Sequence, residues 1–323
     1  MRKDFCLCFN EGYVPYACVT IRSIMDNAKS GDDVVIHVVS DYLSNVSQEF
    51  LKQWNVVFHI INDDSIFDGI DLSVWGIYAL YRFFLPKCLG SDVHKVLYLD
   101  CDVIVNSNLD ELFEMDMHGK AIAGCIDPQT YSKEVFTRLD YDFDKKYICS
   151  GVLIMNLDYW REFRISDKII DFMKKERDKL MFPDQDAINC LCCSNKIILP
   201  PEYGVQCSFL RDSRFLIEHI DNIHSIVDNP KIVHYAGYAP WVYCKNKSLH
   251  SYMWWKTYRS LKAFPMVKVD YMRSAIKYLG RYLLSKFHLI DSGSKFHINQ
   301  YYNHPKVTRK SVKKRIQELK KNV

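Results

Sequence analysis

Apolar residues along the first half of the chain follow two alternating patterns. Short runs rich in β-branched and aromatic residues predict strands at 4–10, 34–40, 56–61, 94–105, 121–127 and 150–157. Apolar residues at helical spacing predict helices at 15–28, 44–54 and 76–88, and another that begins at Pro183. Alternating strands and helices are typical of a mostly parallel sheet covered by helices, so we predict an α/β fold.

The predicted strand 94–105 contains two carboxylates, Asp100 and Asp102, on either side of Cys101. A charge is costly in a buried strand unless something pairs with it. An ordinary turn, a pair of catalytic carboxylates and half of a divalent-metal site are the three interpretations. Residues two apart share one face of an extended strand, and α/β sheets bind ligands at the carboxyl ends of their strands. The pattern favours a shared cation, and oxygen ligands suit Mg²⁺ or Mn²⁺ better than zinc.

Composition and charge divide the chain into two parts. With 48% hydrophobic and 25% charged residues in 323, the chain is globular rather than disordered. The net charge of +4 hides an asymmetry, because residues 256–323 hold 17 Lys+Arg against 3 Asp+Glu, and residues 1–255 hold 26 against 36. We therefore predict a main domain at 1–255 and a basic helical tail at 256–323 that meets an anionic partner.

The tail contains the pattern of an amphipathic helix. Its apolar positions at helical spacing are Met272, Ile276, Leu279, Leu283 and Phe287, and its basic stripe is Arg273, Lys277 and Arg281. Such a helix can lie at an anionic membrane surface, which is the interpretation we favour. Docking on the main domain is the alternative. Nucleic acid is not expected, because no nucleic-acid-binding fold surrounds the tail.

The remaining signals concern location and cysteines. The start, "MRKDFCLCFNEGY", has no signal-peptide pattern, and no stretch of eighteen residues is free of charge, so neither a signal peptide nor a membrane span is expected. We expect a cytoplasmic protein, held at the inner face of the membrane by its tail. The twelve cysteines are then reduced thiols, and the cluster at 190–193 lacks a second ligand pair at zinc spacing.

The segment "KVLYLDCDVIV" (95–105) resembles the D-x-D region of family-8 glycosyltransferases, retaining enzymes of GT-A fold that use nucleotide-sugar donors. Further blocks stand in the family's order: "LYRFFLP" (80–86), "CID" (125–127), "SGVLIMNLDYW" (150–160), "PDQDAIN" (183–189) and "KIVHYAGYAPW" (231–241). The D-x-D motif alone is weak, whereas the ordered set is specific. The resemblance covers about residues 4–241 and makes 1–255 a GT-A nucleotide-sugar-binding domain.

The resemblance implies that Asp100, Asp102 and His234 bind Mn²⁺ or Mg²⁺. Without it, a histidine after an apolar run is usually an ordinary core residue. Breaking the sugar–diphosphate bond leaves negative charge on the diphosphate, and a divalent cation stabilises that charge as a Lewis acid.

The resemblance also implies three catalytic residues, Asp184, Gln185 and Asp127. It places Asp184 on the hydroxyls of the donor sugar, Gln185 beneath the anomeric carbon, and Asp127 near donor and acceptor. Helix capping is the alternative at 184–186, and capping of the turn at Pro128 is the alternative for Asp127. An amide is a poor nucleophile, so a front-face mechanism is implied in which the diphosphate takes the proton of the acceptor.

For the UDP-sugar donor, the resemblance implies contacts near the first strand, the metal motif and the later blocks. Cys8 and Asn10 would face uracil and ribose, with Tyr13 nearby, and Arg82 would contact sugar hydroxyls, a surface charge being the alternative. The donor-binding set is completed by Asp100, Cys101, Cys149, Ser150 and Gly237.

Three positions depart from the family pattern. Cys149 stands where the family has an asparagine on the donor sugar, and Asn10 replaces an aspartate. Ala239 stands before Pro240 where the family has a lysine on the diphosphate, with Lys245 or Lys247 as candidate substitutes. Losing one such diphosphate contact costs about 2–4 kcal/mol of transition-state stabilisation.

We therefore predict a metal-dependent retaining glycosyltransferase that moves galactose or glucose from UDP to a glycan or lipid-linked saccharide. A protein of the same fold that binds UDP-sugar or glycan with little turnover is the alternative. A nucleotidyltransferase is a third reading, for which the "PDQD" block offers no reason.

Overall fold

The computed structural model describes residues 1–70, 76–206, 208, 213–237, 239–241 and 250–261, which fall into two compact units. The first unit consists of Met1–Val205 with Asn222–His234, and the second of Gln206–Asp221 with the chain from Tyr235 onward. The predicted boundary after residue 255 falls inside helix α11 (Ser251–Ser260), and most of the predicted tail lies outside the described residues. The division into 1–255 and 256–323 therefore stays a prediction.

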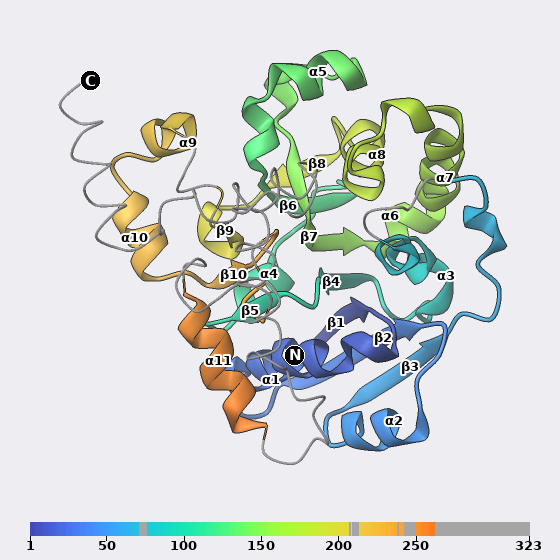
Figure 1. The fold of residues 1–323 in the computed structure, drawn as a ribbon, viewed down its shortest axis with the longest axis vertical. Coiled ribbons are helices and arrows are strands. Elements are labelled where there is room, and N and C mark those ends of the chain that lie inside the picture. The colour runs from blue at the N-terminus through green and yellow to red at the C-terminus, as the bar shows by residue number, and fades with distance from the viewer. Residues whose placement is uncertain (71–75, 207, 209–212, 238, 242–249, 262–323) are drawn as a thin grey trace, which may run out of the picture. The chain divides into compact units, whose positions relative to one another are not determined.

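A seven-stranded sheet forms the centre of the first unit (Figure 1). From one edge to the other, its strands are β3 (Val56–Ile60), β2 (Asp33–Ser40), β1 (Arg2–Cys8), β4 (Lys95–Leu99), β7 (Ile148–Asn156), β6 (Ile122–Ile126) and β8 (Lys196–Ile198). Neighbours run parallel, except that β7 is antiparallel to both β4 and β6. The predicted α/β class is confirmed.

The described helices of the first unit include all four that the sequence predicts, at 15–28, 44–54, 76–88 and from Pro183. Their bounds are α1 (Val14–Asn27), α2 (Asn45–Leu51), α3 (Leu85–Cys88), α4 (Asp110–Glu114), α5 (Lys133–Leu139), α6 (Leu157–Glu162), α7 (Ile165–Lys175), α8 (Pro183–Leu191) and α10 (Ile223–Asp228). The helix predicted at 76–88 begins as a 3₁₀ helix, η3 (Ile77–Phe84), and continues as α3. None of the described helices combines the length and the apolar character that a membrane crossing requires.

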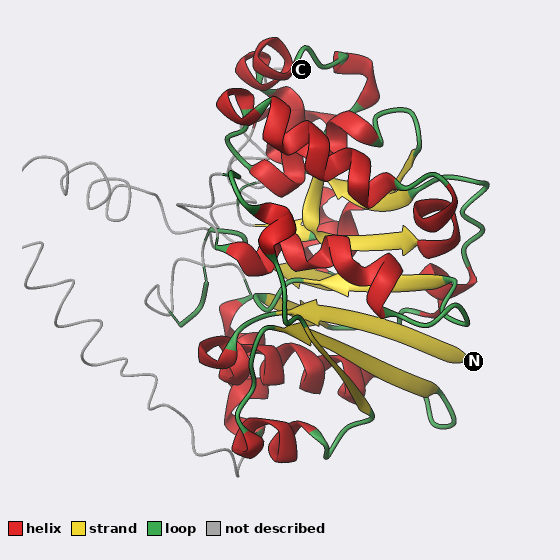
Figure 2. Ribbon diagram, turned by 90° about the vertical axis from the view of Figure 1, so that its right-hand side faces the viewer, coloured by secondary structure: helices red, strands yellow, loops and turns green. Residues whose placement is uncertain are grey.

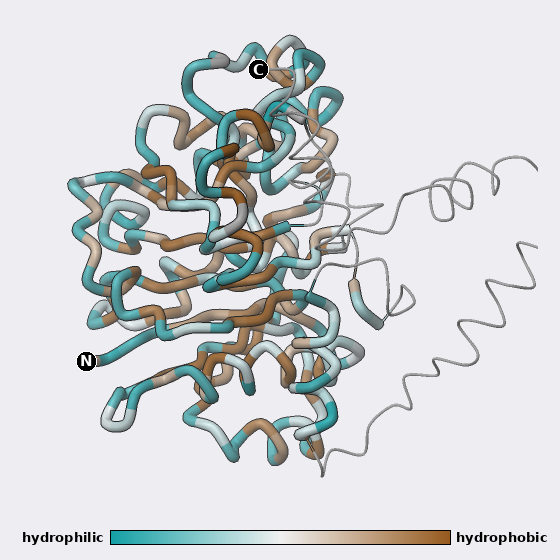
Figure 3. The backbone as a smooth tube through the Cα atoms, turned by 90° about the vertical axis from the view of Figure 1, so that its left-hand side faces the viewer, coloured by the Kyte–Doolittle hydropathy of each residue, from teal (hydrophilic) through white to brown (hydrophobic). Residues whose placement is uncertain are grey.

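One buried apolar cluster joins the sheet to its helices. It brings residues of β1, β4 and β7 together with residues of η3, α3, α6, α7 and α8. Figure 2 shows the strands as one layer with helices packed against it, and Figure 3 shows hydrophobic residues along much of the central strands. Strands buried on both faces read as continuous apolar runs rather than alternating ones, which explains the pattern of "KVLYL" in β4.

The predicted single strand at 94–105 is wrong. β4 ends at Leu99, residues 100–102 form a turn, and Val103–Val105 form β5 in a second sheet of order β5-β10-β9. In that sheet β5 pairs antiparallel with β10 (Ile232–His234), and β9 is Val205–Gln206. The turn is held by buried Thr20, whose hydroxyl donates to the carbonyls of Cys101 (3.0 Å) and Val103 (2.9 Å). The chain thus leaves one sheet for another at the two carboxylates.

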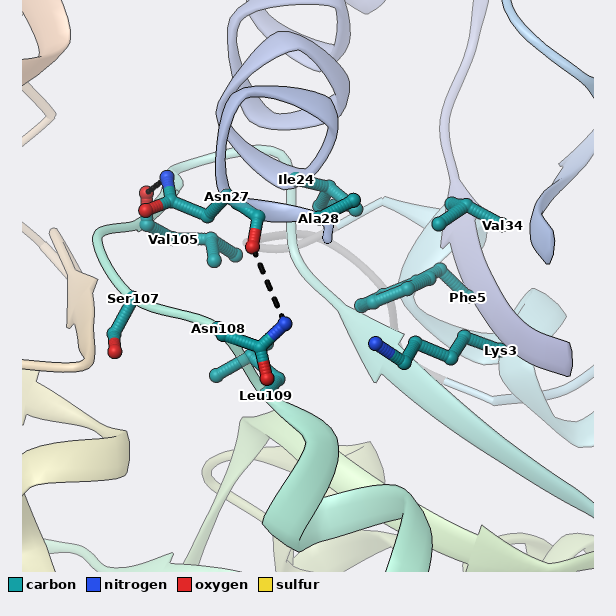
Figure 4. A pocket seen from close by; sticks show the side chains of 10 residues that line it. All are labelled: Lys3, Phe5, Ile24, Asn27, Ala28, Val34, Val105, Ser107, Asn108 and Leu109. Carbon is teal, nitrogen blue, oxygen red and sulfur yellow. Dashed lines mark hydrogen bonds between the residues drawn. The ribbon is translucent and has the colours of Figure 1, made fainter. Parts of the chain in front are cut away.

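The amino end of β1 holds a buried cation, Lys3, beside a small pocket (Figure 4). Lys3 Nζ lies 2.5 Å from Asp32 Oδ2 and also pairs with Asp110. A buried charge needs such partners, and these two carboxylates supply them. The pocket lies at the amino end of the parallel strand β1, away from the carboxyl ends where sheets of this class bind ligands.

The second unit contains α9 (Ser213–Glu218) and α11 among its described residues. Trp254 of α11 is fully buried and lies against Trp241 and Tyr258, with ring centroids 5.1 Å apart in each pair. Tyr235 donates a hydrogen bond of 2.9 Å to the carbonyl of His250. Aromatic packing therefore organises the described part of this unit.

Candidate active site

Asp100, Asp102 and His234 meet where the two sheets of the first unit join. The two carboxylates stand in the turn between β4 and β5, and His234 ends β10, where it pairs with Val103 of β5. His234 Nε2 lies 3.2 Å from Asp102 Oδ1 and 3.7 Å from Asp100 Oδ2. One ligand atom from each residue lies within 4.8 Å of the others. A turn between two sheets, not one face of an extended strand, brings the carboxylates together.

This group of three fits a divalent cation. Two carboxylates and an imidazole are ligands that suit Mn²⁺, and the carboxylates also suit Mg²⁺. Behind the group runs Gly151 of β7, whose carbonyl accepts the N–H of Asp100 at 2.9 Å. A Cβ at Gly151 would lie 2.6 Å from Asp100 Oδ2 and 2.7 Å from His234 Nε2, closer than real Cβ atoms come. Only glycine leaves the carboxylate and the imidazole in this arrangement.

His234 carries contacts on both ring nitrogens and is 4% exposed. Its Nδ1 lies 3.5 Å from Cys149 Sγ, on the side of the ring away from the carboxylates. Burial by itself lowers the pKa of the imidazole, but Asp102 and then Cys149 outweigh that effect and hold the pKa of His234 well above its usual value. The two carboxylates therefore favour positive charge at this site.

Arg82 is buried at 2% exposure, so the surface-charge alternative is wrong. Its Nη2 lies 3.3 Å from Asp100 Oδ1 and 3.4 Å from Asp184 Oδ2, and its Nη1 donates to the carbonyl of Ser150 at 2.5 Å. The guanidinium lies over the ring of Tyr98, 4.1 Å from the centroid. Tyr98 donates its hydroxyl to the same Asp100 Oδ1 at 2.7 Å. Oδ1 of Asp100 is thereby occupied, and Oδ2 faces His234.

Asp184 and Gln185 lie in the first turn of α8, beside the start of β7. Burial raises the pKa of Asp184, and the charge of Arg82 opposes that shift. Gln185 Oε1 accepts the backbone N–H of Ser150 at 2.9 Å, which fixes the amide. Neither residue caps α8. The carboxylate that binds the start of this helix is Asp186, which accepts the N–H groups of Met181 (2.8 Å) and Phe182 (2.9 Å).

Asp127 and the first loop make local hydrogen bonds. Asp127 caps the 3₁₀ turn that follows it by accepting the N–H of Gln129 at 2.9 Å, so the capping interpretation is confirmed and its nearness to substrates stays a prediction. Asn10 accepts the N–H of Tyr13 at 3.1 Å in the same way, at the carboxyl end of β1. Cys8 is buried, whereas Tyr13 is 47% exposed. Their contacts with uracil and ribose stay predictions.

The other predicted donor residues divide between the two units. Cys101 lies buried in the turn between the two carboxylates, and Cys149 and Ser150 lie at the start of β7. Gly237 belongs to the second unit and adopts φ of +69°, a conformation that favours glycine. The candidate substitutes for the missing lysine, Lys245 and Lys247, lie outside the described residues.

The comparisons with known proteins agree with this geometry. The model of glycosyl transferase family 8 matches residues 5–245, more than half of the chain. The chain belongs to this family. As a family-8 glycosyltransferase it is an enzyme, and the predicted family is confirmed.

Relatives of this family-8 glycosyltransferase include bacterial enzymes. A lipopolysaccharide 1,2-glucosyltransferase of Escherichia coli is 27% identical over 243 residues, which cover 72% of this chain and 71% of that enzyme. Glycosyltransferase GlyF of Streptococcus pneumoniae serotype 4 (strain ATCC BAA-334 / TIGR4) is 27% identical over 297 residues, 88% of this chain and 68% of GlyF.

The galactosyltransferase LgtC, solved in complex with donor and acceptor sugar analogs, superposes with a TM-score of 0.72 at 22% identity. The match covers 81% of this chain and 97% of LgtC. At this identity the likeness establishes the fold, and the predicted GT-A fold is confirmed.

Two residues of this glycosyltransferase's site were not singled out in the sequence, although a signal for each was present. Tyr98 stands two residues before Asp100 on the apolar strand, a spacing that puts both on one side of the chain. Gly151 stands inside a strand pattern, where a glycine often marks the close approach of another group.

Proposed function

We propose that this glycosyltransferase is a retaining hexosyltransferase that moves galactose or glucose from UDP to a saccharide or lipid-linked saccharide, with Mn²⁺ or Mg²⁺. The observation that carries the proposal is the meeting of Asp100, Asp102 and His234, with Arg82 joining Asp100 to Asp184. The names of the relatives support a hexose, since one is a glucosyltransferase and LgtC is a galactosyltransferase.

Asp100, Asp102 and His234 would hold the cation. When bound, a divalent cation stabilises the charge that develops on the departing diphosphate. Tyr98 and Arg82 hold one oxygen of Asp100, so the carboxylate does not have to reorganise when the donor arrives.

The sugar would be positioned by the start of α8. Asp184 accepts hydrogen bonds from sugar hydroxyls, and the nearby charge of Arg82 favours its ionised form despite burial. Gln185 presents its amide oxygen to the anomeric carbon, where positive charge develops, and the N–H of Ser150 orients this amide. The acceptor hydroxyl attacks on the face from which the diphosphate leaves, and the diphosphate takes its proton. This scheme assigns no general base to the protein.

A screen of UDP-sugars for UDP release in the presence of Mn²⁺ tests the reaction class and the donor together. We expect release with one common UDP-hexose and a loss of about 100-fold or more in the Asp102→Ala and His234→Ala variants. Asp158→Ala, which removes an exposed ion pair with His94 and Arg161, is the matched control and should behave as wild type. Turnover that survives both site substitutions would contradict the proposal.

A binding protein of the same fold is the second candidate, favoured by Cys149 and Ala239 at positions where the family has an asparagine and a lysine. Calorimetry distinguishes the two. Binding of UDP without release of UDP from any common donor would favour the binding protein.

A further inference from the structure

The imidazole of His234 is held from two sides. Nε2 faces the carboxylates of Asp102 (3.2 Å) and Asp100 (3.7 Å), and Nδ1 faces Cys149 Sγ at 3.5 Å. The ring is 4% exposed and Cys149 is 5% exposed, so both groups depend on protein partners.

A histidine that binds a cation through one nitrogen carries its proton on the other, and that N–H needs an acceptor. Such acceptors fix the orientation of the ring. In this site the acceptor position is filled by the sulfur of Cys149, a weak but sufficient acceptor at this distance. We propose that Cys149 is a positioning residue, which accepts a hydrogen bond from Nδ1 of His234 and keeps Nε2 directed toward the cation. The inference rests on the proposed metal site at Asp100, Asp102 and His234.

The backbone around Cys149 supports this role because it is held on both sides. The N–H and carbonyl of Ile148 both bond to the side chain of Asn189, each at 2.8 Å. The N–H of Ser150 donates to Gln185 and its carbonyl accepts from Arg82. The thiol is therefore carried on a fixed strand segment and has little freedom to leave the imidazole.

Strand geometry gives a second reason. Cys149 and Gly151 both belong to β7, in the stretch between Ile148 and Leu153 where its pairing with β6 shifts register. Both face His234: Cys149 contacts Nδ1, and the missing side chain of Gly151 leaves room for Nε2 and Asp100 Oδ2. Residues of one strand therefore fix the orientation of the His234 imidazole at both of its nitrogen atoms. A side chain at position 149 that cannot accept a hydrogen bond should leave the imidazole less firmly oriented.

The test measures Mn²⁺ affinity in the absence of donor, from the electron paramagnetic resonance signal of free Mn²⁺. We expect Cys149→Ala to bind Mn²⁺ about 10-fold more weakly than wild type, and Cys149→Ser to recover part of the loss, since a hydroxyl also accepts a hydrogen bond. Cys192→Ala removes an equally buried thiol of the apolar cluster, well apart in the sequence from the metal ligands, and should keep wild-type affinity.

Thermal unfolding of the metal-free proteins separates positioning from packing. A packing effect alone would lower the unfolding temperature of both alanine variants and the Mn²⁺ affinity of neither. Wild-type affinity in Cys149→Ala, together with weak binding in His234→Ala, would overturn the role of Cys149 and leave the metal site standing. Absence of Mn²⁺ binding by wild type would overturn the metal site and this inference together. If Cys149→Ala fails to fold, the test uses Cys149→Ser instead. A Mn²⁺ affinity of Cys149→Ser equal to that of wild type would then overturn the positioning role of Cys149.

Discussion

The two carboxylate oxygens of Asp100 have different contacts. Its Oδ1 is taken by the hydroxyl of Tyr98 and by Arg82, and its Oδ2 faces His234. The pairing compensates the cost of holding a carboxylate at the end of a buried strand. It also orients the free oxygen, so residues outside the ligand set contribute to the geometry of the site.

We expect Tyr98→Phe to lower kcat/KM for UDP release about 10-fold. The substitution removes one hydrogen bond to a charged group, worth about 1.5–3 kcal/mol, and releases Asp100 from its orientation. Tyr81→Phe is the matched control, because Tyr81 is also buried and donates to an aspartate, Asp64, at 2.9 Å. An equal loss of kcat/KM in both variants would contradict an orienting role for Tyr98.

Gly151→Ala should abolish Mn²⁺ binding and lower the rate of UDP release about 100-fold or more, because the new methyl group would displace Asp100 and His234. The paired control is Gly124→Ala on β6, where the nearest atoms are the side-chain ends of Leu153 (3.0 Å) and Ile148 (3.1 Å). That variant should lose stability by about 1–3 kcal/mol and keep its Mn²⁺ affinity. Metal titrations of both proteins check the difference, and tight Mn²⁺ binding by Gly151→Ala would refute the close approach.

At the scale of elements, the start of α8 depends on one buried carboxylate. Asp186 is fully buried and accepts hydrogen bonds from Tyr147 (2.6 Å), from the N–H groups of Met181 and Phe182, and from Arg138 (2.9 Å). These contacts tie the segment before α8 to α5 and to the residue before β7. Asp184 and Gln185 therefore depend on Asp186 for their position.

Asp186→Ala should lower the free energy of unfolding by about 3–5 kcal/mol, because it takes the acceptor away from the buried hydroxyl of Tyr147 and from the N–H groups of Met181 and Phe182. Urea unfolding measures the loss. Asp158→Ala, whose carboxylate is exposed, should change the same quantity by less than about 1 kcal/mol. Similar values for the two variants would show that Asp186 is not a structural anchor.

The edge of the main sheet contains a pair of histidines that makes stability depend on pH. His37 Nδ1 lies 3.0 Å from His59 Nε2, and His37 Nε2 lies 3.0 Å from Asp4 Oδ1, on three adjacent strands. Burial and then His37 lower the pKa of His59 to about 4. Between pH 6.5 and 4 the unfolded chain therefore binds more protons at His59 than the folded protein does, so this contribution is complete above pH 6.5 and is lost as the pH falls.

Because His59 is only partly buried, this linkage should lower the free energy of unfolding by roughly 1 kcal/mol between pH 7 and pH 5. His59→Gln should show a shallower decline over the same range, since the titrating group is gone. Urea unfolding at several pH values gives the comparison, and His94→Gln, at a side chain 69% exposed, should decline as wild type does. A decline in His59→Gln as steep as that of wild type would refute the effect.

At the scale of the whole molecule, charge is distributed unevenly along the chain. The segment 256–323 has 17 basic and 3 acidic residues, whereas residues 1–255 have more acidic than basic ones. Most of this segment lies outside the described residues, so its role rests on sequence alone. A lipid-linked acceptor lies in a membrane, and a basic amphipathic segment would hold the enzyme at the surface of that membrane.

We expect the full chain to sediment with anionic liposomes and a chain ending at Leu261, just after α11, to remain in solution. Neutral liposomes should retain neither protein, because the attraction is electrostatic and is screened by salt. Equal partitioning of the two chains on anionic liposomes would end the membrane hypothesis.

The sequence by itself determined the α/β class, the strands of the main sheet other than β8, and the residues proposed for the metal site. It did not predict β8, β9 or β10. Runs of β-branched residues located the strands, helical spacing located α1 and α2, and the ordered blocks pointed to Asp100, Asp102 and His234. The sequence shows these features because the spacing of its apolar residues depends on which residues are buried and on whether they lie in a helix or a strand.

Only the tertiary structure decided how these residues meet. In the structure, β4 ends at Leu99 and Val103–Val105 form a strand of a second sheet. There β5 pairs with β10, which places His234 beside the turn. The tertiary structure buried Arg82 between Asp100 and Asp184, and it placed Cys149 against an imidazole 85 residues away in the chain. A periodic pattern shows that a residue is buried, but not which distant group it contacts, because those contacts depend on how separate strands pair and pack.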